Sequence, residues 1–218
     1  MAAKSILEDI RKNQIIEAAL RVVARQGYYN LNMELVAKEA KMSKGGIAHY
    51  FKSKKELFKA VFVRFFETIF IRSQNTLDRI KDPIEKLVSF VWLYDWDDKD
   101  VFTGYPILFD FMSIAARDED YKEIFTSWIE SWIQLLKGCL IEAKDMGILD
   151  PQMDEDDVAR AISALYQGIG ERWFLSPDRH PTNWAKGFLK QGVYGLIGPY
   201  LLKNIETKGV RDGNFSIN

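Results

Sequence analysis

Apolar residues recur every three or four positions along most of the chain, which is the spacing of amphipathic helices rather than of strands. The pattern predicts an all-α protein whose first helix ends at Gly27 and is followed by two short helices, capped by Asn32 and Ser43. A long fourth helix is predicted after Ser53. In the motif Ser-Lys-Lys-Glu that starts there, the side chains of Ser53 and Glu56 are expected to satisfy free backbone N–H groups reciprocally.

The second half of the chain repeats the same helical spacing at greater length. Further helices are predicted to start at Asp82-Pro83, at about Pro106, at about Asp118 with an end near Gly147, and at Asp154, before a last helix that ends near Leu202. The long fourth helix is expected to join the two halves of the protein rigidly.

Composition restricts the class of protein. With 218 residues, 47% of them hydrophobic, the chain can bury an ordinary core. Its longest run without a charge, Gln191–Leu202, is too short to span a bilayer, and the charged N-terminus does not resemble a signal segment. One cysteine and two histidines predict no disulfide and no metal site. We expect a cytoplasmic protein without membrane contact, catalytic residues or cofactor.

The net charge of −1 conceals an uneven distribution. Residues 1–60 contain 12 Lys and Arg against 6 Asp and Glu, so the remainder of the chain is acidic. A basic N-terminal region on an acidic body indicates that a polyanion such as nucleic acid meets the N-terminal region alone. The alternative is a chance distribution of solvated charge.

Two very short helices packed on a longer one form the geometry of a helix-turn-helix, whose second helix enters the major groove of DNA. The second short helix, Lys44 to Tyr50, contains Gly45, Gly46 and Ala48, which allow the backbone to approach DNA closely. Ile47 is expected to point inward with Phe51, leaving His49 and Tyr50 outside. The alternative is a loop that happens to contain two glycines.

Residues from about Ile15 to Val61 resemble the DNA-binding domain of TetR-family transcriptional regulators. The resemblance rests on an ordered set of residues: an Ala-Ala-Leu first helix, Gly27, Val36-Ala37, Ser43, Gly45, Tyr50-Phe51 and Ser53-Lys54 followed by Glu56-Leu57. It implies a homodimer with one DNA-reading domain per subunit and a variable effector domain. It also implies that Tyr50 and Lys54 contact phosphate and that residues 44–49 face the bases.

The predicted DNA-binding residues are Asn32, Ser43, Lys44, Gly45, Gly46, Ala48, His49, Tyr50 and Lys54. Two of them depart from the family's usual pattern. Asn32 stands where the family commonly has Thr, and either residue caps a helix well. Ala48 stands where the family commonly has Tyr, so base recognition is expected to use fewer side chains here.

The segment from Trp92 to Trp173 contains five of the six tryptophans. Ligand pockets are concave, mostly apolar and often aromatic, so we expect an effector site there for an apolar or aromatic-binding small molecule. The predicted lining residues are Trp92, Trp96, Phe109, Met112, Trp128, Trp132, Tyr166 and Trp173. The alternative is a well-filled helical core. Acidic residues at 95–100 and Glu171 would suit a cationic ligand, or they form a solvated loop and a surface pair with Arg172.

The last two helices are rich in small residues such as Gly187, Gly192 and Gly195, which permit close helix approach. Together with Val158, Ile162, Leu165, Phe188 and Val193 they predict a homodimer interface of two helices from each chain. Packing within one chain is the alternative.

These patterns predict a helix-turn-helix DNA-binding domain over 9–58, a ligand-binding and dimerisation domain over 59–205, and a flexible tail over 206–218. The function that fits them is a ligand-responsive transcriptional regulator, in first place a repressor that leaves a near-palindromic double-stranded DNA operator when a small molecule binds. An activator or co-repressed regulator is equally compatible with the sequence. The alternative from another class is a soluble helical small-molecule-binding protein or enzyme that does not bind DNA.

Overall fold

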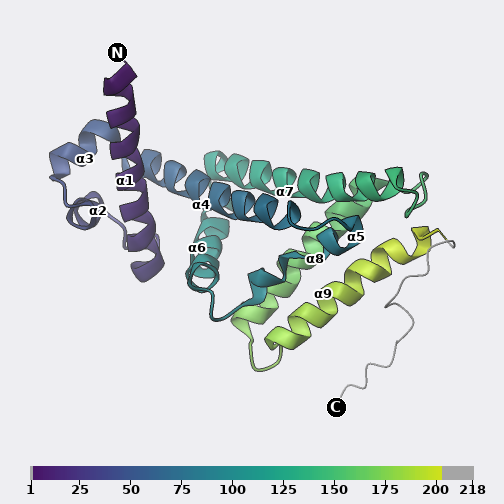
Figure 1. The fold of residues 1–218 in the computed structure, drawn as a ribbon. Coiled ribbons are helices and arrows are strands. Elements are labelled where there is room, and N and C mark those ends of the chain that lie inside the picture. The colour runs from purple at the N-terminus through teal and green to yellow at the C-terminus, as the bar shows by residue number, and fades with distance from the viewer. Residues whose placement is uncertain (1, 203–218) are drawn as a thin grey trace.

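The computed structural model describes residues 2–202, and every regular element in that range is helical (Figure 1). The predicted tail, 206–218, lies outside the described residues. The helices are α1 (Ala2–Gln26), α2 (Met33–Ala40), α3 (Lys44–Tyr50), α4 (Lys54–Leu77), α5 (Pro83–Leu87), α6 (Lys99–Ala115), α7 (Glu119–Asp145), α8 (Glu155–Leu175) and α9 (Thr182–Ile197), with short 3-10 turns η1 (Phe90–Tyr94) and η2 (Gly198–Tyr200).

Helices α1–α3 form one end of the molecule, which we call the head (Figure 1). The predicted caps are in place. The Asn32 side chain accepts hydrogen bonds from the N–H groups of Glu34 and Leu35, and the Ser43 hydroxyl accepts one from Gly46. Such caps satisfy N–H groups that a helix start leaves unpaired, so these two residues set the lengths of α2 and α3.

Two residues with positive φ end the first two helices. Gly27 follows α1 with φ 75°, as the sequence predicts, and Lys41 follows α2 with φ 55°. The left-handed conformation is unfavourable for a residue with a Cβ, so Lys41 carries local strain in the turn between α2 and α3. The N–H groups of Lys41 and Met42 bond to carbonyls of α2, which holds this turn tight.

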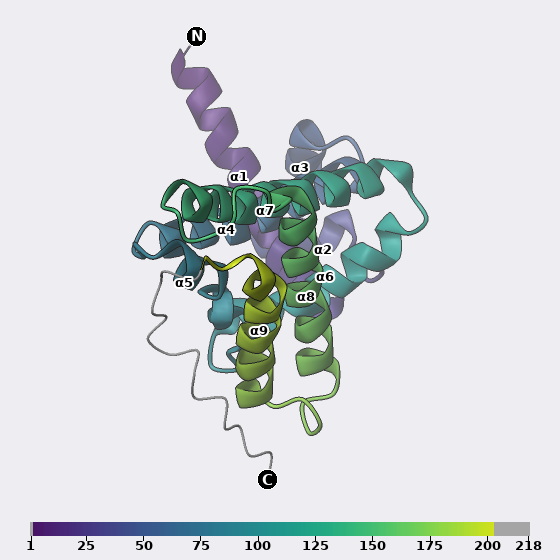
Figure 2. The same ribbon diagram turned by 90° about the vertical axis from the view of Figure 1, so that its right-hand side faces the viewer.

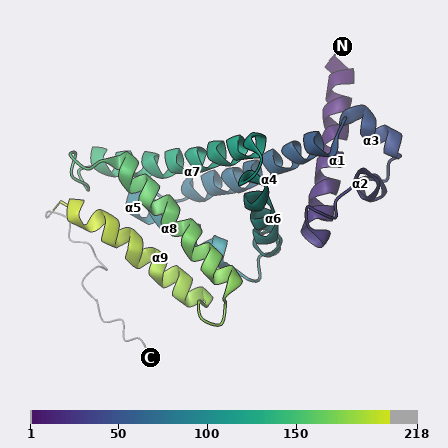
Figure 3. The ribbon, with the colours of Figure 1, turned by 180° about the vertical axis from the view of Figure 1, so that it is seen from behind.

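Helix α4 runs from the head into the rest of the molecule, which we call the body (α4–α9). Views from the side and from behind show α4 beside α7, with α8 and α9 crossing below them (Figures 2 and 3). This arrangement confirms the prediction that a long fourth helix connects the two halves.

The hydrophobic core has two clusters, and the first is not confined to the head. It contains buried residues of α1–α4 and continues into α6 and α7 through Phe111 and Tyr121. Phe62 of α4 lies against Phe111, with ring centroids 4.0 Å apart. The second cluster joins α5 and η1 to α7, α8 and α9. The head and the adjoining part of the body therefore share apolar packing.

Helix α6 shows where the sequence-based boundary is wrong. A start at about Pro106 was expected, but the helix begins at Lys99 and contains Pro106 in its interior. The Asp98 side chain accepts bonds from the N–H groups of Asp100 and Val101, so this cap starts the helix earlier. The proline is tolerated on an exposed face at the loss of one backbone hydrogen bond.

The start of α4 also differs in detail from the expected capping box. The Glu56 N–H donates to the Ser53 hydroxyl at 3.0 Å, as predicted. The Glu56 carboxylate, however, accepts a bond from the N–H of Lys52 rather than from that of Ser53. The Glu56 side chain therefore bonds to the residue one position earlier in the chain than the motif predicts.

An ion-pair cluster links the first turns of α4 and α7. The Lys55 ammonium lies 2.8 Å from carboxylate oxygens of both Asp118 and Asp120, and the Lys59 ammonium is 2.8 Å from Asp120. Hydrogen bonds from the two lysines lower the pKa of the Asp120 carboxyl to about 2. The pKa of Asp118 is also lowered, chiefly by the bond from Lys55.

We expect acid to remove the stabilisation from this cluster. A carboxyl whose pKa is depressed in the folded protein contributes stability above its ordinary pKa of 3.8, and that contribution disappears as the pH falls to about 2. The urea midpoint of Asp120→Asn should therefore lie below that of the parent at pH 7 and approach it by about pH 2. Because the groups are exposed, high salt should shrink the difference at pH 7. A difference that is independent of pH would contradict the assignment.

Candidate nucleic-acid interface and effector cavity

Helix α3 has one buried face and one free face. Ile47 is fully buried and Phe51 nearly so, and they anchor the helix on the core of the head. Ala48 and His49 are exposed, and Tyr50 is half-buried. Ile47, Phe51, Ala48 and His49 lie as the sequence predicts, whereas Tyr50 packs in part against the core of the head instead of lying fully outside. The short side chains of α3 are available to a partner.

The free face of α3 carries small side chains and has a lysine near each end. A Cβ placed on Gly45 meets no atom within 4 Å, whereas one on Gly46 approaches the Ser43 hydroxyl at 3.3 Å. Lys44 is exposed at the first turn, and the Lys52 ammonium donates to the carbonyls of Ala48 and His49. Helix α3 thus has a lysine near each end and small side chains between them. This arrangement suits a helix that approaches a phosphate backbone and base edges.

Two predicted DNA contacts have other partners in the structure. The Lys54 ammonium donates to the Tyr28 carbonyl at 3.2 Å and lies 4.6 Å from the centroid of the Tyr28 ring. Partial burial lowers the pKa of Lys54. The Asn32 side chain is exposed, but its oxygen is used as the cap of α2. Both residues position the head, and their contact with phosphate stays a prediction.

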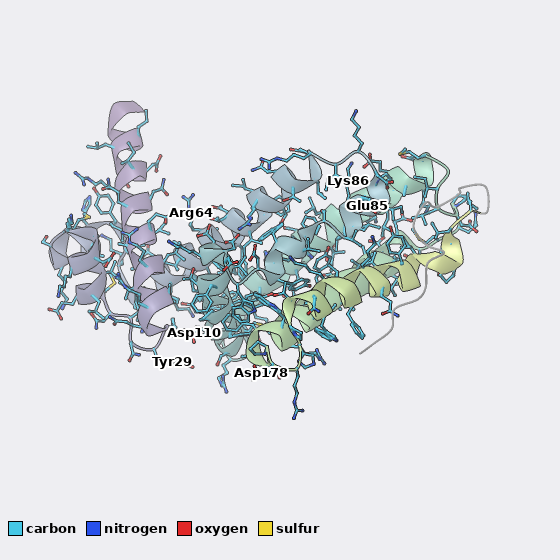
Figure 4. All side chains as sticks on the ribbon, turned by 60° about the horizontal axis from the view of Figure 1, so that its bottom comes forward. Tyr29, Arg64, Glu85, Lys86, Asp110 and Asp178 are labelled. Atoms are coloured by element: carbon cyan, nitrogen blue, oxygen red, sulfur yellow. The ribbon has the colours of Figure 1, made fainter. Side chains whose placement is uncertain are left out.

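The head is fastened to the body where α1 ends. The Asp110 carboxylate of α6 accepts a hydrogen bond of 2.7 Å from the Tyr28 N–H, and Figure 4 shows Asp110 at this junction near Tyr29.

Within the head, Glu39 of α2 is paired with Arg21 at 2.8 Å and with Arg25 of α1. Hydrogen bonds from both arginines lower the pKa of Glu39.

A cavity of about 360 Å³ lies between the head and the body. Its lining comes from α1, α4, η1, α6, α7 and α8, and it is mainly apolar, which is typical of small-molecule sites. Four of the eight predicted ligand residues line it, and they are Trp92, Trp128, Trp132 and Tyr166. The structure thus brings half of the predicted set together around one cavity.

The other four predicted ligand residues lie outside this lining. Trp173 is fully buried in the core, where its indole N–H donates to the Thr182 hydroxyl at 3.0 Å. Trp96 packs on Trp173 with ring centroids 4.2 Å apart. Phe109 packs near Phe174, and the sulfur of Met112 lies 4.0 Å from the Gln167 amide. Core packing is therefore the role that the structure shows for Trp173 and Trp96, whereas Phe109 and Met112 are half-buried and belong to neither core cluster.

Sequence reasoning missed the part of the lining that comes from the head. Glu17, Leu20, Arg21 and Ala24 of α1 all face the cavity. Leu20 and Ala24 are half-buried and have the same apolar character as core residues of α1 such as Ala19 and Val23, so nothing in the pattern separates cavity from core. Arg21 connects the cavity wall directly to α2 through its pair with Glu39.

The polar groups of the cavity are arranged on two sides. On α4, the Arg72 guanidinium lies 3.9 Å from the centroid of the Trp92 ring and 2.5 Å from the Asp98 carboxylate. On α8, the Glu171 carboxylate accepts a bond from the Gln167 amide at 3.1 Å, whereas the Arg172 guanidinium bonds to the Gly168 carbonyl. Glu171 and Arg172 therefore do not form the surface pair with each other that the sequence analysis considered.

Two donors in the cavity wall stay unsatisfied. Within the described residues, the indole Nε1 atoms of Trp92 and Trp128 are buried and have no hydrogen-bond partner. A buried donor without an acceptor is destabilising by about 1–3 kcal/mol, so such groups require an explanation. Acceptor atoms of a ligand in the cavity would give these two N–H groups hydrogen-bond partners.

The outer face of α8 and α9 is less apolar than predicted. Val158, Ile162 and Val193 are buried in the core of their own chain, and a Cβ on Gly192 would lie 2.5 Å from the Leu165 side chain. These predicted interface residues therefore serve intramolecular packing. The exposed face retains Phe188, which is 47% exposed and packs on Trp184, together with Gly187 and Gly195.

Comparison with known proteins identifies the family. The model for bacterial regulatory proteins of the tetR family matches residues 15–61. The chain is 30% identical over 178 residues to the transcriptional repressor KstR2 of Mycolicibacterium smegmatis, covering 75% of this chain and 79% of that protein. It is 26% identical over 200 residues to the regulator PksA of Bacillus subtilis, covering 88% and 93%.

A solved structure shows the same fold. A transcriptional regulator from Saccharomonospora viridis, in complex with choline, superposes with a TM-score of 0.72 at 22% identity over 83% of this chain and 93% of that one. The chain is a helix-turn-helix transcriptional regulator and not an enzyme. It belongs to the TetR family and binds DNA. Among residues 2–202, no helix has the length and apolarity needed to cross a membrane.

Proposed function

We propose that the protein is a homodimeric repressor that releases a near-palindromic operator when a small molecule fills the cavity. The observation that carries this proposal is the shared wall: four residues of α1, a helix of the head, line the cavity together with residues of the body. A ligand that binds one orientation of α1 better than another changes the spacing of the two heads.

The DNA contacts in this proposal come from the free face of α3 and its ends. Ser43, Lys44, Gly45, Gly46, Ala48 and His49 surround the point of closest approach, with Tyr50 at the edge. In a dimer, two such helices enter successive major grooves. We assign residues 9–58 to the DNA-binding domain and residues 59–205 to the effector and dimerisation domain, and we place the protein in the cytoplasm, where operators are accessible.

The dimer is proposed to form through the exposed face of α8 and α9. Phe188 supplies an apolar anchor, while Gly187 and Gly195 allow a second copy to approach closely. An interface between identical faces is the usual arrangement for a twofold dimer. The repressor KstR2 and the choline-bound regulator support the roles of repression and effector binding by analogy.

An anisotropy titration of labelled upstream DNA tests the function. The protein should elute as a dimer in gel filtration and bind the fragment in the absence of ligand. A compound that raises the melting temperature in a thermal-shift screen should then weaken DNA binding by about 5–150-fold, the usual range of allosteric coupling. Tighter DNA binding with the ligand would instead identify a co-repressed regulator, and no DNA binding in either condition would refute the proposal.

A further inference from the structure

The cavity continues into a second hollow along α4. Thr68, Arg72 and Trp92 line both spaces, so together they form the connection between them. The second hollow adds Ile71, Asn75, Thr76 and Arg79. All seven of its lining residues lie in the described part of the chain, and none of them is acidic. The hollow therefore has a cationic, polar lining, whereas the cavity behind it is aromatic.

The connection between the two spaces carries hydrogen-bond donors without acceptors. Among the described residues the buried Trp92 indole N–H has no partner, and the hydrogen bond of Arg72 to Asp98 uses one of the two terminal nitrogens of the guanidinium. The guanidinium carbon also lies 3.9 Å from the centroid of the Trp92 ring, a cation–π contact that restricts the position of the guanidinium. A fork of donors held in one plane matches the two oxygens of a carboxylate.

We propose that the effector is an organic acid with a flat apolar body, whose carboxylate binds Arg72 and the Trp92 N–H while its body fills the aromatic cavity. This inference rests on the proposed effector role of the cavity. Arg79 adds positive charge beside the same point, and the unpartnered Trp128 N–H offers a second donor to a polar atom on the body of the ligand.

The acidic groups of the cavity do not favour a cation at this point. Glu171 lies on α8 and is bonded to Gln167, Glu17 belongs to α1 and Asp100 belongs to α6, so none of the three lines the hollow along α4. Within residues 2–202, Asp98 is the one carboxylate bonded to Arg72, and it is also the cap of α6. Asp98 therefore competes with the ligand for the same guanidinium.

Three compounds of nearly equal shape test whether the site prefers an acid, a neutral molecule or a cation. They are 1-naphthylacetate, the neutral 1-naphthylacetamide and the cation 1-naphthylmethylammonium. Calorimetric titration of the full-length protein should show the acid binding at least tenfold more tightly than the other two. Arg72→Gln should reduce acid binding to the level of the amide and leave the amide unchanged. Arg117→Gln, which removes an exposed guanidinium at the end of α6, is the matched control and should change neither.

A second variant predicts a change of opposite sign. Asp98→Asn keeps a helix-capping side chain but frees Arg72, so the acid should bind several-fold more tightly. Trp92→Phe keeps an aromatic ring, though a smaller one, and removes the donor, so acid binding should weaken several-fold. Tightest binding of the ammonium probe, equal acid binding by the parent and Arg72→Gln, or no binding of any probe at millimolar concentration would each overturn the inference.

The same proteins separate this inference from the proposed function. Operator binding by the ligand-free parent together with no preference for the acid would refute the ligand class and leave the regulator intact. Preferential acid binding that depends on Arg72, without any effect on operator binding, would support the site and refute ligand-controlled release.

Discussion

Replacing Gly45 by glutamate is expected to weaken operator binding by about 100-fold or more while leaving the protein folded. A side chain at Gly45 meets no atom of its own chain within 4 Å, so the protein itself does not oppose the change. On DNA, the new side chain would stand between α3 and the groove and bring a negative charge toward phosphate. A tenfold change corresponds to about 1.4 kcal/mol, so this loss is modest compared with the repulsion and steric conflict introduced.

Gly45→Ala separates the effect of size from that of charge. Alanine favours the helix by about 1 kcal/mol over glycine, so the variant should be more stable than the parent yet bind DNA less tightly. Gly138→Glu is the matched control, because Gly138 is also exposed on a helix and has open space around it. DNA anisotropy and urea unfolding measure the two quantities. Parent-like DNA binding by Gly45→Glu would exclude α3 as the reading helix.

Replacing Trp173 by alanine is expected to lower the free energy of unfolding by about 3–5 kcal/mol, the usual cost of removing a large buried aromatic side chain. Trp173 is fully buried, packs against Trp96 and Tyr105, and donates a hydrogen bond to Thr182. The substitution leaves a cavity in the core and takes away the N–H group that bonds to the Thr182 hydroxyl. The effect should appear in urea unfolding at fixed protein concentration, because dimerisation contributes to the measured stability.

Phe102 provides the control for this substitution. It packs on Trp96 and Phe174 at the edge of the same aromatic group, but it is 53% exposed. Phe102→Ala should therefore cost much less than Trp173→Ala. Equal and small losses for the two variants would show that Trp173 lines a ligand space, as the sequence suggested, rather than filling the core.

The local features of the fold were predictable because they depend on neighbours in the sequence. Asn32, Ser43, Asp118 and Asp154 each cap the helix that was expected after them, since a side-chain acceptor and its N–H partners lie within three residues. The start of α6 was not predictable in the same way. The start was expected at about Pro106 and the acidic residues 95–100 were read as a ligand-facing cluster or a solvated loop, whereas the Asp98 side chain caps the helix.

The lining of the cavity was predictable only in part because it depends on how separate helices meet. Trp132 and Trp173 have the same chemistry and similar helical surroundings in the sequence, yet one lines the cavity and the other fills the core. Residue type identifies an aromatic-rich body, but the direction of each ring follows from helix packing. Arg72 was missed altogether, since its significance arises from Trp92 and Asp98, which are distant in the sequence.

The contribution of α1 to the cavity has a consequence for protein engineering. A chimaera that exchanged residues 9–58 for those of another regulator would replace Glu17, Leu20, Arg21 and Ala24, and so would change the lining of the cavity along with the DNA sequence that is recognised. A junction that retains the cavity-facing side chains of α1 and grafts only α2 and α3 would preserve the original cavity lining. Biosensors assembled from this scaffold should therefore be joined within the first helix rather than at the start of the fourth.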